Sequence, residues 1–194
     1  MTFDQPMRPA SFSFCRTDRL RTFRRLGTTA AVEETASPYA LIRNGFAAGV
    51  PFAPHARIEV VEVGAGLAIA RLEDSPEVHN HIGSVHAGAV FTLGETASAA
   101  AMLGVFAEQM PIIRPVTIEA TISYLKIARG TLVATARTAL AAEHLQDEFA
   151  AQGRATLDLS VDIADDRGIA AQMKATWMVS ASKSGRGWMS AFYR

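Results

Sequence analysis

The segment HNHIGSVHAGAVFTLGETASAAAMLGVF, residues 79–106, decides the fold of this chain. It opens with Asn, His and Gly residues and continues into a long run of small and apolar residues, which one charged side chain, Glu95, interrupts. Apolar residues occupy every side of the helical wheel, so the run predicts a helix that is buried all round. A carboxyl group inside such a helix loses its water, which disfavours the charged form unless partners compensate. Glu95 is therefore the first candidate for chemistry.

The same run has to be weighed as a membrane span. At a rise of about 1.5 Å per residue, residues 88–106 are long enough to cross a bilayer. An acid at the centre of the span would cost about 2.5–3.5 kcal/mol on insertion scales. The surrounding Ala, Ser and Thr residues offer little hydrophobic gain against that cost. We therefore expect a buried core helix and no membrane partner.

Length, charge and cysteine content limit the classes of protein to which the chain can belong. A chain of 194 residues favours one domain, and zero formal net charge gives no reason to expect nucleic acid as a partner. The single Cys15 excludes an intrachain disulfide and is typical of a cytoplasmic protein. Residues 1–37 are rich in Arg but lack the apolar stretch of a signal peptide. We expect loose tails at 1–37 and 182–194 around one domain at 38–181.

Alternation of apolar and polar residues predicts a sheet that packs against this helix. In 117–126, Ile118, Ala120, Ile122 and Tyr124 share one face, opposite Thr117. Residues 154–163 and 169–179 alternate in the same way, and a hairpin turn at 165–168 joins them.

Further strands are expected at 56–63, 67–72 and 132–140, and short helices at 38–49 and 142–152. The pattern predicts an α+β fold in which one curved antiparallel sheet of about six strands wraps around one long central helix.

The motif Asn80-x-x-Gly83-x-x-His86-x-Gly88, followed by Glu95, resembles the hotdog-fold acyl-CoA thioesterases. This group includes the phenylacetyl-CoA and 4-hydroxybenzoyl-CoA enzymes. The likeness covers roughly residues 41–180. With the additional helix expected at 142–152, between the fourth and fifth strands, the chain resembles a thioesterase-like branch of the superfamily that has little assigned function.

The resemblance implies hydrolysis of an acyl-CoA thioester to the free acid and coenzyme A. It gives Glu95 the role of base or nucleophile and the N–H of Ala87 that of oxyanion donor, with Asn80 and Thr117 as orienting groups. We expect the N–H of the neighbouring Gly88 to hold the oxyanion together with that of Ala87. Most family members carry Gly where this chain has Ala87, and an alanine keeps the N–H. No cofactor and no metal is implied, because coenzyme A is part of the substrate. The expected substrate-binding residues are His81, Gly83, His86 and Gly88.

The distance between two of these residues predicts an oligomer. Glu95 follows Ala87 by eight residues, which is about 12 Å along a helix axis. One thioester carbonyl cannot contact both positions within a single chain. The site therefore requires Ala87 from one subunit and Glu95 from another, which predicts a homodimer or a dimer of dimers with shared sites.

Several alternatives remain open at this point. The histidines at 79, 81 and 86 fit no established zinc spacing. Asn80 could cap a turn instead of orienting Glu95. His81 and Glu95 are separated as in hotdog dehydratases, so a hydratase or dehydratase of acyl thioesters is a second candidate. A third is a non-catalytic acyl-CoA-binding protein. Basic residues near strand ends, Lys126, Arg129 and Arg71, either meet coenzyme A phosphates or are simply solvated.

Overall fold

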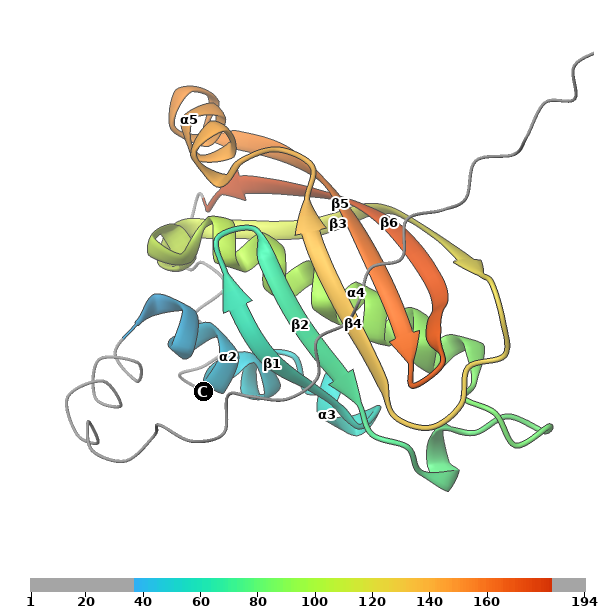
Figure 1. Cartoon of the computed structure of the whole chain (residues 1–194). Coiled ribbons are helices and arrows are strands. Elements are labelled where there is room, and N and C mark those ends of the chain that lie inside the picture. The colour runs from blue at the N-terminus through green and yellow to red at the C-terminus, as the bar shows by residue number, and fades with distance from the viewer. Residues whose placement is uncertain (1–36, 183–194) are drawn as a thin grey trace, which may run out of the picture.

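The computed structural model describes residues 37–182, and the tails expected at 1–37 and 182–194 lie almost wholly outside that range. Six strands form one antiparallel sheet in the order β1-β2-β4-β5-β6-β3. The long helix α4 crosses the concave face of this sheet (Figure 1). The strands are β1 (Ile58–Gly64), β2 (Leu67–Leu72), β3 (Ile113–Tyr124), β4 (Leu132–Thr138), β5 (Arg154–Asp165) and β6 (Gly168–Ala181). The expected hotdog architecture is confirmed.

Helix α4 (Ala87–Val105) is the core of the molecule. It packs against β1, β2, β4, β5 and β6. From Thr96 to Val105 every residue is buried, as the sequence predicts, whereas the first turn at Ala87 and Gly88 is exposed. By length and composition α4 could cross a membrane, but 72% of its apolar window is buried inside the fold, as in a core helix.

The remaining helices lie at the ends of the sheet. Helix α2 (Pro38–Gly49) begins after the N-cap Ser37 and buries Ile42 and Phe46 beside β1. The short α3 (Phe52–His55) follows it, and the sequence does not predict it. Helix α5 (Ala142–Gln152) contacts β5 and ends at Gly153, whose φ of 66° is the left-handed C-cap conformation. Both longer helices have the predicted bounds. Two short 3-10 segments, η1 (Pro76–Val78) and η2 (Ala107–Ile112), complete the order.

Alternation is most regular in β5, where buried and exposed residues succeed one another along almost the whole strand. Three register shifts break the pattern elsewhere, and one of them lies between Val60 and Glu62 of β1. The remaining two change the facing of residues in β6 and β3. One, opposite residues 163 and 164, makes Ile169 pair with Ala164 and leaves its side chain 44% exposed. The other lies between Thr117 and Glu119. A bulge adds one residue to a strand, so the residues on its two sides change faces relative to a simple period of two.

The predicted facing of β3 is therefore wrong in part. Thr117 pairs with Trp177, while Ala120 and Ile122 pair with Ala175 and Met173. All three partners are buried residues on the helix-facing side of β6. Thr117 thus lies on the inner face together with Ala120 and Ile122, not opposite them. The bulged Ile118 is 55% exposed and does not join the core.

Candidate functional site

Glu95 lies at the middle of α4 and is half-buried. Together with Gly88 and Thr92 it forms an uncovered stripe at helical spacing, since these residues are exposed or half-buried whereas most of α4 is buried. Burial raises the pKa of the Glu95 carboxyl, and a hydrogen bond from Thr117 partly opposes this effect. The desolvation expected of an acid in this helix is confirmed. A carboxylate whose pKa is raised accepts a proton more readily than an exposed one, which suits it to act as a general base.

Thr117 is the side chain that reaches this acid. Its hydroxyl donates to Glu95 Oε1 over 3.5 Å, from the edge strand β3. The bulge at Ile118 makes this contact possible. Without the bulge, strict alternation would put Thr117 on the face opposite to Ala120 and Ile122, so they could not all face α4. The structure therefore brings together Glu95 and Thr117, which the sequence could pair only through the family resemblance.

Ser98 and Trp177 hold the backbone of Glu95, and the sequence analysis did not assign Trp177 to the site. The indole N–H of Trp177 donates to the Ser98 hydroxyl over 3.0 Å, and that hydroxyl donates to the Glu95 carbonyl oxygen over 2.7 Å. Ser98 is completely buried and Trp177 is 7% exposed. Fully satisfied buried polar networks of this kind fix one geometry. The signal available in the sequence was a Trp in the inward register of β6, which needs a partner for its N–H.

The loop before α4 holds the predicted Asn80 and Gly83. The Asn80 side-chain oxygen accepts from the N–H groups of Ile82 and Ser84, and its amide donates to the Ser84 hydroxyl over 2.8 Å. Gly83 has a φ of 68°, which favours glycine. Within one chain Asn80 therefore closes the turn and makes no contact with Glu95. His81 is exposed in this loop.

His86 is the N-cap of α4. Its Nδ1 accepts a hydrogen bond from the Gly88 N–H over 2.9 Å, which fixes the start of the helix. Gly88 thus has its N–H occupied and is not free as an oxyanion donor in this arrangement. The Ala87 N–H makes no hydrogen bond within residues 37–182. It is exposed at a helix N-terminus, where backbone N–H groups favour negative charge.

A pocket of about 390 Å³ opens beside Ala87. The phenol of Tyr124, at the end of β3, donates to the Ala87 carbonyl oxygen over 3.0 Å and forms part of its wall. Burial raises the pKa of this phenol. Strand β3 therefore flanks both halves of the candidate site, with Thr117 at Glu95 and Tyr124 at Ala87. The further lining residues are Asn80, Ile82, Ser84, Val85, Val90, Leu125, Lys126, Ile127, Ala128, Ala170 and Ala171.

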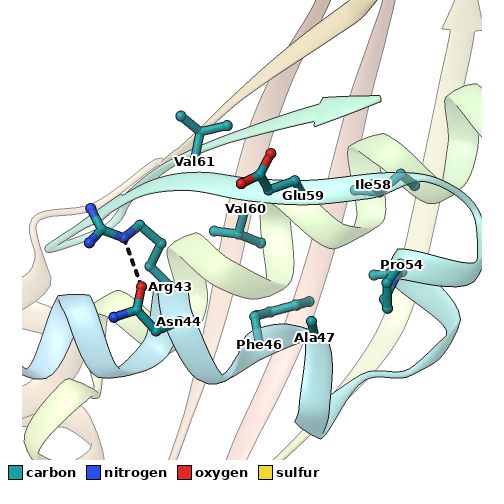
Figure 2. Close-up of a pocket in the computed structure, with 10 residues that line it drawn as sticks. Arg43, Asn44, Phe46, Ala47, Pro54, Ile58, Glu59, Val60 and Val61 are labelled. Carbon is teal, nitrogen blue, oxygen red and sulfur yellow. Dashed lines mark hydrogen bonds between the residues drawn. The ribbon is translucent and has the colours of Figure 1, made fainter. Parts of the chain in front are cut away.

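A second pocket, of about 590 Å³, lies between α2, α3 and β1 (Figure 2). Figure 2 shows Arg43 bonded to Asn44 at one end and Glu59 pointing from β1. Glu59 pairs with Arg71 over 3.3 Å. No lining residue belongs to α4 or β3, so this pocket is separate from Glu95 and from Ala87.

The three histidines near the start of α4 do not come together. His79 pairs with Asp74 over 2.7 Å, His81 is exposed, and His86 caps the helix. In the part of the chain that the structure describes, no group of three or more His, Cys, Asp or Glu side chains gathers in a way that could hold a metal ion.

Comparison with solved structures gives relatives of this architecture. The chain aligns with a Pseudomonas aeruginosa protein of unknown function, PA5026, described as a probable thioesterase, at 27% identity and a TM-score of 0.64, covering 75% of this chain and 97% of that one. The PaaI protein of the E. coli phenylacetic acid degradation operon aligns at 19% identity and a TM-score of 0.58, covering 74% and 93%. A putative thioesterase from Shewanella oneidensis aligns at 18% identity and a TM-score of 0.61, covering 74% and 96%.

The two matches below 25% identity establish the fold alone, and all three neighbours are hotdog-fold, thioesterase-like proteins. No curated protein matches the chain at the level of sequence. A family model described as a domain of unknown function, DUF4442, matches residues 39–179, which is nearly all of the described structure. The chain therefore belongs to the DUF4442 family and carries its domain on a hotdog fold.

Proposed function

We propose that this protein hydrolyses acyl-CoA thioesters. The observation that carries the proposal is Glu95, a half-buried acid of raised pKa on the uncovered stripe of the central helix, bonded to Thr117. The unoccupied N–H of Ala87 supplies the complementary group, a backbone donor for the oxygen of the thioester carbonyl. The 27% identical relative described as a probable thioesterase supports the same class of reaction.

The reaction balances with these groups alone. Water adds to the acyl carbon while Glu95 accepts its proton, and the carbonyl oxygen gains negative charge beside the Ala87 N–H. The C–S bond then breaks, and the proton passes to the leaving thiolate to give the free acid and coenzyme A. As a nucleophile, Glu95 would instead form an acyl anhydride that water hydrolyses. Neither route needs a cofactor or metal.

The proposal requires a second copy of the chain. Ala87 and Glu95 are separated by about 12 Å along α4 at helical rise, so one carbonyl cannot meet both in one subunit. The edge strand β3 has an unpaired side and carries two exposed apolar residues, Val116 and Ile118. An exposed apolar edge strand is a site for pairing with another chain. We place the subunit interface along β3 and the uncovered stripe of α4.

A thiol-release assay tests the reaction. Purified protein is incubated with short, long and aromatic acyl-CoA thioesters and a thiol reagent, and kcat is compared with that of Glu95→Gln. Loss of the base is expected to lower kcat by about 10²–10⁴-fold. Glu62→Gln is the matched control, because Glu62 is an exposed acid on β1, at the opposite edge of the sheet from β3. Near-normal turnover by Glu95→Gln would contradict the assignment.

Two variants separate the remaining alternatives. A dehydratase that pairs His81 with Glu95 should lose activity on His81→Ala, whereas the proposed thioesterase retains it because His81 is exposed in the loop and has no described contact with Glu95. Tight acyl-CoA binding by the wild type without thiol release would instead identify a non-catalytic binding protein.

Subunit complementation tests the shared site. Ala87→Pro removes the proposed donor, and proline is well tolerated at the first position of a helix. The preceding residue, His86, has φ −64° and ψ 137°, the extended conformation that a following proline requires. Glu95→Gln and Ala87→Pro homodimers should both be inactive. Random dimers co-expressed from both variants should regain about a quarter of wild-type activity, because half of them contain one intact site. No recovery would place both groups in one chain.

A further inference from the structure

The pocket beside Ala87 is mainly apolar. Val85 and Ala171 belong to its wall, with Val90 of α4 below and Leu125 and Ile127 of the β3–β4 loop at its rim. Leu125 and Ile127 are 57% and 53% exposed, which is unusual for side chains of this size. The pocket is therefore suited to an apolar or weakly polar arm of a ligand whose reactive end lies at Ala87.

The same loop carries charge immediately beyond the apolar rim. Lys126 and Arg129 belong to the β3–β4 loop, and Arg167 belongs to the β5–β6 turn opposite it. We call these three residues the basic ledge. A hollow of about 380 Å³ is lined by Arg129, Gly130 and Thr131 from the loop and by Asp166 and Arg167 from the turn.

A buried carboxylate holds part of this ledge in place. Asp165, whose side chain is fully buried, accepts from Lys126 over 2.9 Å and from Arg167 over 2.7 Å. Burial by itself would raise the pKa of Asp165, but the hydrogen bonds from Lys126 and Arg167 hold it well below its usual range. Arg167 also donates to the Ile127 carbonyl, which ties the turn to the loop. Three cations thus face two carboxylates, Asp165 and Asp166.

Arg129 is the cation of the ledge that pairs with no acid in residues 37–182, whereas Lys126, which lines the apolar pocket, pairs with Asp165. The Arg129 guanidinium donates weakly to the Gly83 carbonyl over 3.4 Å. Both neighbours of Gly83, Ile82 and Ser84, line the apolar pocket. Arg129 therefore stands at the rim where the apolar pocket meets the charged hollow, with N–H groups left for an anion.

An apolar pocket that ends in a basic ledge is complementary to a long, thin ligand with an anionic head. We propose that Arg129, supported by Arg167, binds the phosphates of coenzyme A while the pantetheine arm lies in the pocket beside Ala87. This assignment rests on the proposed function and identifies the carrier group of the substrate. Arginine suits this role because its planar fork of N–H groups matches phosphate oxygens.

Titration calorimetry with coenzyme A and with pantetheine tests the assignment independently of turnover. Wild type should bind coenzyme A more tightly than pantetheine, and the difference should shrink as salt is raised. Arg129→Gln should weaken coenzyme A binding about tenfold and leave pantetheine binding unchanged. Arg137→Gln is the matched control, because Arg137 is exposed at the opposite end of β4. Circular dichroism spectra verify that both variants fold.

The outcomes separate the two proposals. Equal affinity for coenzyme A and pantetheine in the wild type, or coenzyme A binding that Arg129→Gln leaves unchanged, would overturn the phosphate site even if thioesters are hydrolysed. Conversely, the predicted binding pattern without thiol release would support the phosphate site and overturn the hydrolase. For an active enzyme, Arg129→Gln should raise KM for an acyl-CoA about tenfold, with kcat and the KM for the corresponding acyl-pantetheine unchanged.

Discussion

Replacing Gly104 by alanine should destabilise the protein strongly, although alanine is the better helix former. A Cβ at position 104 would lie 2.0 Å from the carbonyl oxygen of Gly64 and 3.2 Å from Val63 Cγ1. The first of these neighbours is backbone in the β1–β2 hairpin, so either the hairpin or α4 has to move. A clash with backbone belongs to the severe cases of overpacking, which cost about 3 kcal/mol or more of folding free energy. The better helix propensity of alanine offsets about 1 kcal/mol of this cost. A net loss of at least about 2 kcal/mol follows.

Gly94→Ala is the matched control in the same helix. Its Cβ would meet Ile163 Cδ1 and Met173 Sδ, both at 3.0 Å. These atoms are the ends of side chains that can turn aside, so strain and helix propensity should nearly cancel. The free energy of unfolding should change by no more than about 0.5 kcal/mol.

Urea and thermal unfolding followed by circular dichroism measure both variants, at one protein concentration because an oligomer's stability depends on it. Gly104→Ala should lower Tm by about 4–8 °C, at about 2–4 °C per kcal/mol for a chain of this size. If Gly104→Ala were as stable as Gly94→Ala, the close approach of α4 to the hairpin would be refuted. The position of Glu95 relative to the sheet would then need revision as well.

Three further predictions concern the site. Because burial raises the pKa of Glu95, folding disfavours its charged form, so Glu95→Gln should be more stable than wild type above the folded pKa. The stability difference between the two proteins should disappear at acid pH. Unfolding measured from pH 4 to 8 tests this, and a stability difference independent of pH would contradict it. Thr117→Val removes the hydrogen bond that lowers this pKa, so the acid limb of the kcat/KM profile should move to higher pH. Thr156→Val, at an exposed position of β5 away from the proposed interface, should leave the profile in place. Trp177→Phe leaves the buried Ser98 hydroxyl without its donor and should lower the free energy of unfolding in urea by about 1–3 kcal/mol. An unchanged urea midpoint would show that the hydrogen bonds between Trp177, Ser98 and Glu95 contribute nothing to stability.

Much of the fold could be predicted from local pattern. The alternation in β5, the hairpin turn at 165–168 and the bounds of α2 and α5 are properties of short segments, and the structure confirms them. The candidate acid could be predicted as well, because one charge in a long apolar run is visible without any tertiary contact. In each case burial or turn chemistry acts between residues that are near in sequence.

The facing of Thr117 could not be predicted, because a single bulged residue reverses it. The bulge at Ile118 follows from how β3 pairs with β6, a strand remote in sequence, and a period-two count cannot detect an added residue. The role of Asp165 also escaped the sequence analysis, which assigned it only to a turn. Asp165 forms ion pairs with Lys126 and Arg167, and Lys126 is remote from it in sequence.

By itself, the sequence determined the central helix, the wrapped sheet and the half-buried acid of that helix, since hydrophobic periodicity and desolvation depend on composition along the chain. Only the tertiary structure decided that Thr117 meets Glu95, that His86 occupies the Gly88 N–H, and that Arg129 stands at the rim of the apolar pocket. These relations depend on strand register and on contacts between distant segments, which the packing of the whole chain fixes.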